Sequence, residues 1–218
     1  EQALLEIMLL DSAHIQEQDV VWTNQKGKRA GRPPVEPLYT VEDAMAALDA
    51  LRVYDYQQQF ELCPGVQVRF QDAGHLLGSA IVEIWATEGE KTTKLVFSGD
   101  LGNRNQPIIR DPSYVQEADY VITESTYGDR EHREGEGEYT EDLAKILDGT
   151  FAKGGNVIIP AFAVGRTQEL LYALRQIKQE HLVVHHDGFP VYMDSPLAEE
   201  ATAIFLQCSA EYFDPETR

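Results

Sequence analysis

The sequence predicts a mixed α and β fold in which an antiparallel sheet is followed by repeated strand and helix units. Three patterns predict it: helical spacing of apolar residues at the start, alternation of apolar and polar residues in the first half, and apolar segments separated by helical segments in the second half. With 218 residues, 43% of them hydrophobic, the chain is long enough for one large or two small domains.

Two helices are predicted near the N-terminus. Apolar residues recur at helical spacing between Glu1 and Gln18. A second helix is predicted from Val41 to Leu51, with Thr40 in the position of an N-cap.

Three strands follow these helices. They are expected at Val66 to Phe70, Ala80 to Trp85 and Lys94 to Phe97. The polar break from Glu88 to Lys91 predicts a hairpin between the second and third strands, so this part forms an antiparallel, half-buried sheet.

After about Asp119 the pattern changes to strands that alternate with helices. The strands are expected at Tyr120 to Thr123, Asn156 to Pro160 and Pro190 to Asp194. The helices are expected at Thr140 to Phe151, Thr167 to Glu180 and Leu197 to Cys208. Repeated units of this kind predict a parallel sheet covered by helices. The charged stretch from Arg130 to Tyr139 is interpreted as an exposed, flexible loop.

The net charge of −19 disfavours nucleic-acid binding by diffuse attraction to phosphates. Any nucleic-acid contact must therefore depend on local groups or a bound metal. The one basic cluster comprises Lys26, Lys28, Arg29 and Arg32. Its glycines and prolines predict a solvated, mobile loop, with a phosphate clamp as the alternative.

Other features limit the compartment and the kind of metal site. The chain lacks an apolar run of the roughly 18 residues that a membrane span needs, and its first residues lack the features of a signal peptide. The expected compartment is the cytoplasm, without membrane association. Cys63 and Cys208 are far apart in sequence, which argues against a disulfide framework or a cysteine zinc site.

Candidate chemistry lies in loops that follow strands. His75 stands between Gly74 and Gly78, and Asp100 follows a strand directly after Gly99. Taken alone, a loop histidine is usually structural, and an aspartate in a turn usually bonds its own backbone. As a pair they are zinc-ligand types, and a carboxylate can bridge two ions.

Six ordered motifs make the pattern specific. They span residues 10–17 (LDSAHIQE), 72–80 (DAGHLLGSA), 97–103 (FSGDLGN), 123–130 (TESTYGDR), 159–171 (IPAFAVGRTQELL) and 192–198 (YMDSPLA). Together they resemble the β-CASP proteins of the metallo-β-lactamase superfamily over nearly the whole chain. The similarity is to the bacterial and archaeal ribonucleases of that family and, more distantly, to the endonuclease of mRNA 3′-end cleavage.

This resemblance implies a two-part organisation. Residues 1–123 would form a partial metallo-β-lactamase αββα sandwich, and residues 124–218 part of a β-CASP domain with a parallel, Rossmann-like sheet flanked by helices. The family's HxHxDH motif and closing histidines are absent from the sequence. The chain therefore resembles an internal portion of such a protein, and we expect it to be inactive alone.

The resemblance also implies residue roles and partners. His75 would bind one of two zinc ions, Asp100 would bridge both, and Glu124 would orient a catalytic histidine from later in the chain. The implied reaction is hydrolysis of RNA phosphodiester bonds, with single-stranded RNA held by local contacts. A homo-oligomer is compatible with the sequence, and endonuclease and exonuclease action are not distinguished. Without the resemblance, Glu124 would be interpreted as a carboxylate that caps the backbone after its strand.

Gly165 and Arg166 are candidate substrate contacts because they precede a helix. Free backbone N–H groups and a guanidinium at that position suit a phosphate. In the alternative, Gly165 only makes the turn and Arg166 pairs with Glu169. Ser195 and Pro196 indicate the start of the last helix, as N-cap and first helical residue.

Two functions of other classes are alternatives to the nuclease. One is a non-catalytic β-CASP subunit that scaffolds an RNA-processing complex, which the presence of both His75 and Asp100 argues against. The other is a nucleotide-binding α/β module, which the absence of GxGxxG and GxxxxGK[ST] motifs disfavours.

Overall fold

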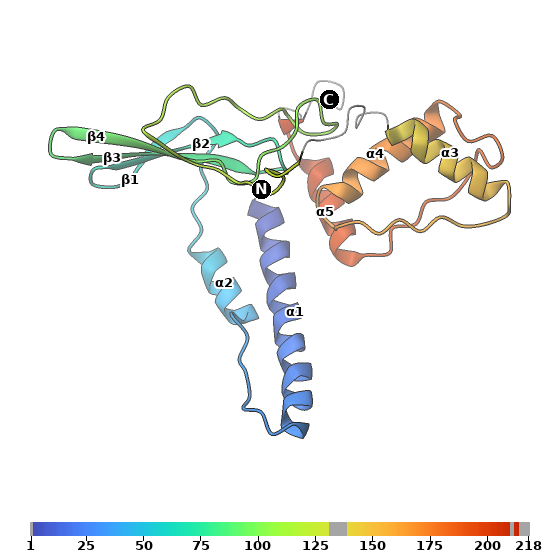
Figure 1. The fold of residues 1–218 in the computed structure, drawn as a ribbon, viewed down its shortest axis with the longest axis horizontal. Helices are drawn as coiled ribbons and strands as arrows, with labels where there is room; N and C mark the ends of the chain where they lie inside the picture. The colour runs from blue at the N-terminus through green and yellow to red at the C-terminus, as the bar shows by residue number, and fades with distance from the viewer. Residues whose placement is uncertain (1, 131–138, 210–211, 214–218) are drawn as a thin grey trace. The chain divides into compact units, whose positions relative to one another are not determined.

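A computed structural model describes residues 2–130, 139–209 and 212–213, and Figure 1 shows the fold. The chain divides into two compact units. The first unit comprises Glu1–Val53 and Ser195–Leu206, and the second comprises Tyr54–Asp194 and Gln207–Arg218. The family-based boundary after residue 123 is a different division and stays a prediction. The stretch expected to be a flexible loop falls mainly on residues 131–138, outside the described part.

The first unit contains helices α1 (Gln2–Arg29), α2 (Val41–Asp49) and most of α5 (Pro196–Gln207). The N-cap predicted for α2 is confirmed: Thr40 Oγ1 accepts the Asp43 N–H at 3.2 Å, and the Asp43 carboxylate accepts the Thr40 N–H at 2.9 Å. This reciprocal capping box satisfies two backbone donors that a helix start leaves free. The predicted start of α5 is also confirmed, since Ser195 Oγ accepts the N–H of Ala198.

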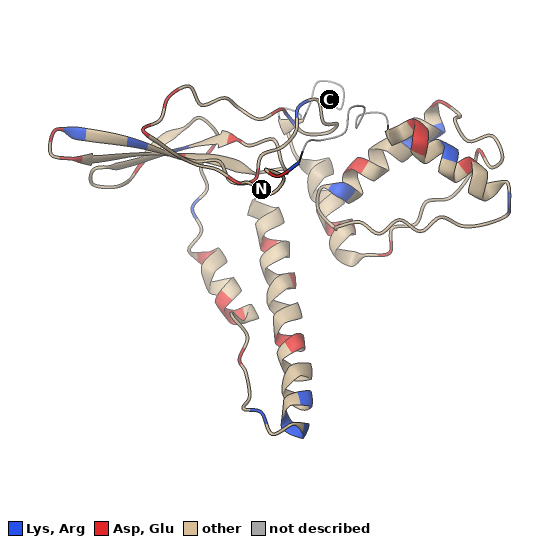
Figure 2. Cartoon of the chain, in the orientation of Figure 1, with Lys and Arg blue, Asp and Glu red and all other residues tan. Residues whose placement is uncertain are grey.

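Helix α1 continues well beyond its predicted end. The predicted loop was wrong for Lys26, Lys28 and Arg29, which form the last turn of the helix (Figure 2). Gly27 costs a helix about 1 kcal/mol relative to alanine, which the remaining turns can absorb. The helix stops at Gly31, whose φ of +66° is unfavourable for residues with a side chain.

The second unit is built on a five-stranded sheet with the order β1-β2-β3-β4-β5. The strands are β1 (Gln59–Cys63), β2 (Val66–Asp72), β3 (Ala80–Glu88), β4 (Lys91–Phe97) and β5 (Tyr120–Ile122). The first four strands pair in antiparallel fashion, and β4 pairs with β5 in parallel. The predicted antiparallel sheet and its β3–β4 hairpin are confirmed, whereas β1 was not predicted.

The strand register gives the sheet one apolar face and one face that combines charged residues with the buried side chains of Ile81 and Val96. Val68, Ile84 and Leu95 lie opposite one another across β2, β3 and β4 on the apolar face. On the other face the Glu83 side chain is 1% exposed and contacts two cations. Its carboxylate accepts hydrogen bonds from Arg69 Nε at 2.6 Å and Gln71 Nε2 at 3.0 Å, and it lies 2.7 Å from Lys94 Nζ.

These contacts determine the ionisation of Glu83. Burial raises the pKa of a carboxyl group because it disfavours the charged form. For Glu83, the hydrogen bonds from Arg69, Lys94 and Gln71 outweigh burial and lower the pKa to about 2. The carboxylate is therefore charged at neutral pH and joins three strands.

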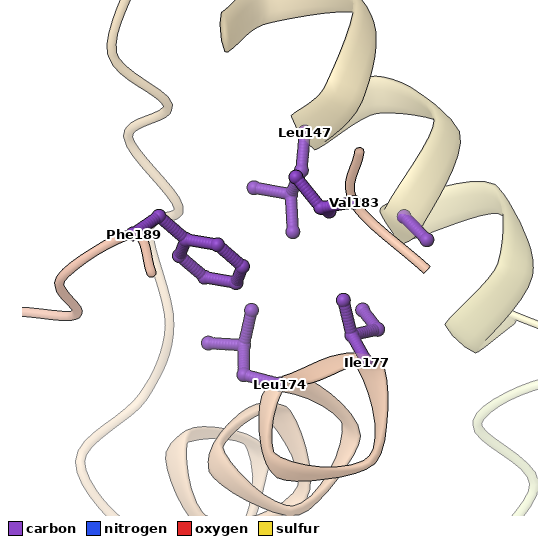
Figure 3. Close-up of a cluster of buried hydrophobic side chains, with 6 residues drawn as sticks. Leu147, Leu174, Ile177, Val183 and Phe189 are labelled. Atoms are coloured by element: carbon purple, nitrogen blue, oxygen red, sulfur yellow. The ribbon is translucent and has the colours of Figure 1, made fainter. Parts of the chain in front are cut away.

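Helices α3 (Tyr139–Phe151) and α4 (Arg166–Gln179) share a separate hydrophobic core. Figure 3 shows Leu147 from α3 facing Leu174 and Ile177 from α4, with Val183 and Phe189 closing the cluster. Each fully buried side chain of this kind stabilises the fold by about 1.5–3 kcal/mol relative to its exposed state.

Two strands predicted in the second half are wrong. Asn156–Pro160 and Pro190–Asp194 are irregular and pair with no strand in the described part of the chain. A β-strand needs a hydrogen-bonded neighbouring strand, and these apolar segments have none among the described residues. Their side chains are also exposed, Ile158 to 91% and Tyr192 to 86%. Consequently the expected parallel, Rossmann-like sheet is not formed by these segments. The broader prediction of a mixed α+β fold is confirmed.

Within the described ranges, no helix combines the length and apolar character that crossing a bilayer requires.

Candidate active site

The direction of the strands brings three loops to one edge of the sheet. Strands β2 and β4 both run antiparallel to β3, so they point the same way, and β5 is parallel to β4. The loops that follow β2, β4 and β5 therefore leave from the same edge. They carry His75, Asp100 and Glu124, respectively.

The loop that carries His75 is held through its backbone. Asp72 Oδ1 accepts the N–H of Gly74 at 2.9 Å, and Ser79 Oγ accepts the N–H groups of His75 at 3.1 Å and Leu76 at 3.2 Å. Gly74 has a φ of +62°, which favours glycine. These contacts leave His75 exposed at the surface of the loop.

A close approach of two glycines joins this loop to the loop of Asp100. The N–H of Gly102 donates to Ala73 O at 2.9 Å. A Cβ placed on Gly102 would overlap the carbonyl oxygen of Gly74. The two backbones thus pack directly on each other, within two residues of both His75 and Asp100.

This packing makes Gly102→Ala a test of the loop arrangement. The added methyl group would meet backbone, which cannot move aside as a flexible side chain can, so we expect a loss of about 1–3 kcal/mol in the free energy of unfolding. Urea unfolding measures it, with Gly149→Ala as control because a Cβ there meets nothing within 4 Å. Equal stability of the two variants would contradict the tight packing.

Glu124 connects the second and third loops. Its Oε1 accepts the N–H of Leu101 at 2.8 Å, and its Oε2 accepts the hydroxyl of Thr126 at 2.7 Å. The hydrogen bond from the Leu101 backbone, that from Thr126 and the charge of His75 lower the pKa of the Glu124 carboxyl. The carboxylate is thus ionised at neutral pH and held in one orientation beside the Asp100 loop.

Sequence analysis missed the polar residues that hold these loops. Ser98 is 5% exposed. Its hydroxyl donates toward Gly99 O at 2.7 Å, lies 3.1 Å from Thr123 Oγ1 and accepts the N–H of Glu124 at 3.3 Å. Ser79 Oγ accepts the N–H of His75, and the hydroxyl of Thr126 donates to the Glu124 carboxylate. The available signal was their position inside the quoted motifs, two to four residues from each candidate.

The donors at this edge suit zinc in kind but not in number. Imidazole and carboxylate are both zinc ligands, and the Asp100 side chain has no hydrogen bond or ion pair with the described residues. In the same ranges, however, no three His, Cys, Asp or Glu side chains are grouped so as to hold a metal ion. A catalytic zinc needs about three protein ligands, so these residues do not complete a site.

The structure favours the alternative interpretation of the Gly165 and Arg166 segment. The N–H of Gly165 donates to Gln168 Oε1 at 2.7 Å and is not free for a ligand. Arg166 forms an ion pair with Glu169 at 2.8 Å, although its side chain stays 61% exposed. A role in substrate binding remains a prediction for both residues.

Comparisons with known proteins show which family the chain resembles. Residues 167–218 match the family model described as the Beta-Casp domain. A ribonuclease of Thermus thermophilus is 40% identical over 183 residues, which is 84% of this chain and 40% of the relative. The endoribonuclease ysh1 of Schizosaccharomyces pombe is 32% identical over 173 residues, 78% of this chain and 22% of the relative. The transcription termination factor FttA of Methanocaldococcus jannaschii is 32% identical over 183 residues, 83% of this chain and 27% of the relative.

These matches confirm the resemblance to the β-CASP proteins. The chain spans less than half the length of each of these relatives.

Proposed function

We propose that the complete protein to which this chain corresponds is a zinc-dependent hydrolase that cleaves phosphodiester bonds in single-stranded RNA. The proposal rests on one observation: three loops that follow strands, and that carry His75, Asp100 and Glu124, are joined to one another. Glycine packing joins the first two loops, and the hydrogen bonds of Glu124 join the second and third. The names of the ribonuclease and endoribonuclease relatives support the reaction class.

In this proposal each residue has a distinct task. His75 and Asp100 would contribute to holding two zinc ions, together with ligands that the described residues do not supply. Bound zinc supplies a water whose pKa is lowered toward neutrality. Glu124 uses one lone pair of each oxygen on Leu101 and Thr126, which leaves lone pairs for the N–H of a histidine. That histidine would protonate the leaving oxygen as general acid.

Substrate contact by Arg166 would require a change in its ion pairing. The guanidinium would have to exchange Glu169 for a phosphate, or share its remaining donors, since Arg offers five N–H groups.

The second candidate function is a non-catalytic β-CASP scaffold. Asp100 argues against it, because an unpaired carboxylate beside a histidine loop has no structural task in the described residues.

Glu124→Gln in the complete protein tests the assigned role. A group that orients a catalytic residue should affect the rate, so we expect cleavage to slow by about 10- to 100-fold. Bound zinc, measured by elemental analysis, should remain near the level of the parent. Glu90→Gln in the exposed β3–β4 turn removes the same charge and serves as control.

The two readouts separate the possible roles of Glu124. Parallel loss of zinc and activity would make Glu124 a metal-site residue and the assigned role wrong. Unchanged activity would remove it from catalysis. A parent protein with bound zinc and no RNA cleavage would favour the scaffold.

A further inference from the structure

The basic cluster at the end of α1 is not used by the site described above. It contains Lys26, Lys28, Arg29 and Arg32, four of the 18 Lys and Arg residues in a chain of net charge −19. Figure 2 shows these cations gathered at the C-terminal end of the helix and in the turn that follows. All four are exposed.

An aromatic residue belongs to the same surface. Trp22, Lys26 and Arg29 follow the spacing i, i+4 and i+7, which places them on one face of the helix. The Lys26 ammonium lies 3.3 Å from the centre of the Trp22 ring, and Trp22 is 58% exposed. One face of the ring thus meets a cation while much of the indole remains accessible to a ligand.

Two sets of hydrogen bonds hold the turn against the helix. Arg32 N–H donates to Gly27 O at 2.9 Å and Gly31 N–H to Lys28 O at 3.4 Å, the Schellman arrangement. Beyond it, the Asn24 side chain donates to Val35 O at 2.9 Å and accepts the Val35 N–H at 2.8 Å. The backbone of Arg32 is therefore held against the end of the helix, and the chain is anchored again three residues later at Val35.

The cluster carries an uncompensated charge. No acidic residue occurs between Asp19 and Glu36. The cations form no ion pair with the described residues. The helix dipole favours cations in a last turn, but it does not explain Arg32 beyond the helix or an exposed tryptophan one turn earlier.

We propose that Trp22 and the four cations form a contact surface for single-stranded RNA. The cations would bind phosphates, and a base would stack on the exposed part of the Trp22 ring. An array of cations beside an accessible aromatic ring is the combination that single strands require, because every base offers a π face next to a phosphate. The identity of the nucleic acid as RNA rests on the proposed function.

The test measures equilibrium binding separately from cleavage. Binding of a short labelled oligouridylate to the complete protein is followed by fluorescence anisotropy at several salt concentrations, with metal removed by a chelator to prevent hydrolysis. One variant changes the four cations of the cluster to glutamine. A control changes four exposed cations elsewhere to glutamine and so alters the net charge equally: Lys91, Lys145, Lys153 and Arg175.

The salt dependence reports the number of phosphates bound. With a slope of about −0.7 per phosphate contact on single strands, loss of four contacts should reduce the slope of log K against log salt by roughly 3. The control should change it much less. Trp22→Ala should weaken binding by roughly 5- to 100-fold without changing the slope, and Trp22→Phe should recover much of the loss.

Several results would overturn the inference. One is an equal slope for the parent and the cluster variant, and another is an equal effect of the cluster and control variants. A third is loss of binding to phosphatidylserine vesicles with RNA binding unchanged, which would assign the surface to membranes. RNA cleavage by the parent is measured in parallel. If the parent cleaves RNA and the cluster variant has an unchanged slope, only this inference is wrong. If the cluster variant has a reduced slope and the parent does not cleave RNA, only the proposed function is wrong.

Discussion

Incubated with zinc and labelled single-stranded RNA, the 218-residue chain should leave the RNA intact. The physical reason is the number of ligands. The described residues bring no three His, Cys, Asp or Glu side chains together for a metal ion, and metal affinity depends on ligand count and on a preformed site. Without a general-acid histidine, a further factor of about 10² to 10⁴ would be lost even with metal present.

The measurement compares this chain with the complete protein at equal concentration. His75→Ala in both forms distinguishes intrinsic activity from a contaminating nuclease, which the substitution would not affect. Suppose the short chain cleaved at a rate near that of the complete protein and lost activity on His75→Ala. The claim that essential ligands lie outside these residues would then be wrong.

How far the fold was predictable depends on the range of each interaction. Thr40 and Asp43 cap α2 through contacts three residues apart, so the pattern was visible locally. The strands at 156–160 and 190–194 were predicted from equally clear apolar runs. They fail because pairing depends on a distant neighbour, and a run of isoleucine and valine looks the same with or without one. For α1, the apolar spacing predicts a helix only as far as Gln18 and the glycines and prolines beyond it a loop, yet the helix continues through Gly27 to Arg29.

The same difference between local and long-range contacts applies to the candidate site. The position of its three loops at one edge of the sheet was predictable because each loop follows a strand, while the roles of His75, Asp100 and Glu124 stay predictions. The supports of these loops were not predictable, because Ser98 and Glu124 are 26 residues apart in sequence and the contact of Gly102 with Gly74 depends on the packing of two loops. The Arg166–Glu169 ion pair was an open alternative, since a spacing of three on a helix permits the pair without requiring it.

Glu83→Gln should produce the largest loss of stability among the substitutions considered. Moving the pKa of Glu83 from its ordinary value of 4.5 to about 2 corresponds to a stabilisation on the order of 3 kcal/mol at neutral pH. Glutamine removes the charge and leaves Arg69 and Lys94 without their counter-ion. Urea unfolding of the 218-residue chain at neutral pH measures the loss. The matched control is Glu61→Gln on β1. Glu61 lies on the same face of the sheet as Glu83 but is exposed, so its substitution should change the stability little.

The pH dependence provides the sharper test of Glu83. A carboxyl whose pKa is lowered by folding stabilises the protein above its unfolded pKa, and this contribution is lost as pH falls toward the folded pKa. The difference in unfolding free energy between parent and Glu83→Gln should therefore be constant above about pH 5 and shrink between about 4.5 and about 2.

Combining Glu83→Gln with Lys94→Met should recover part of the loss, because one of the two uncompensated cations is then removed as well. A difference that is small at neutral pH, or that stays constant down to pH 2, would show that the buried carboxylate does not stabilise the sheet through its charge. The joining of β2, β3 and β4 would then have to be attributed to packing and backbone hydrogen bonds alone.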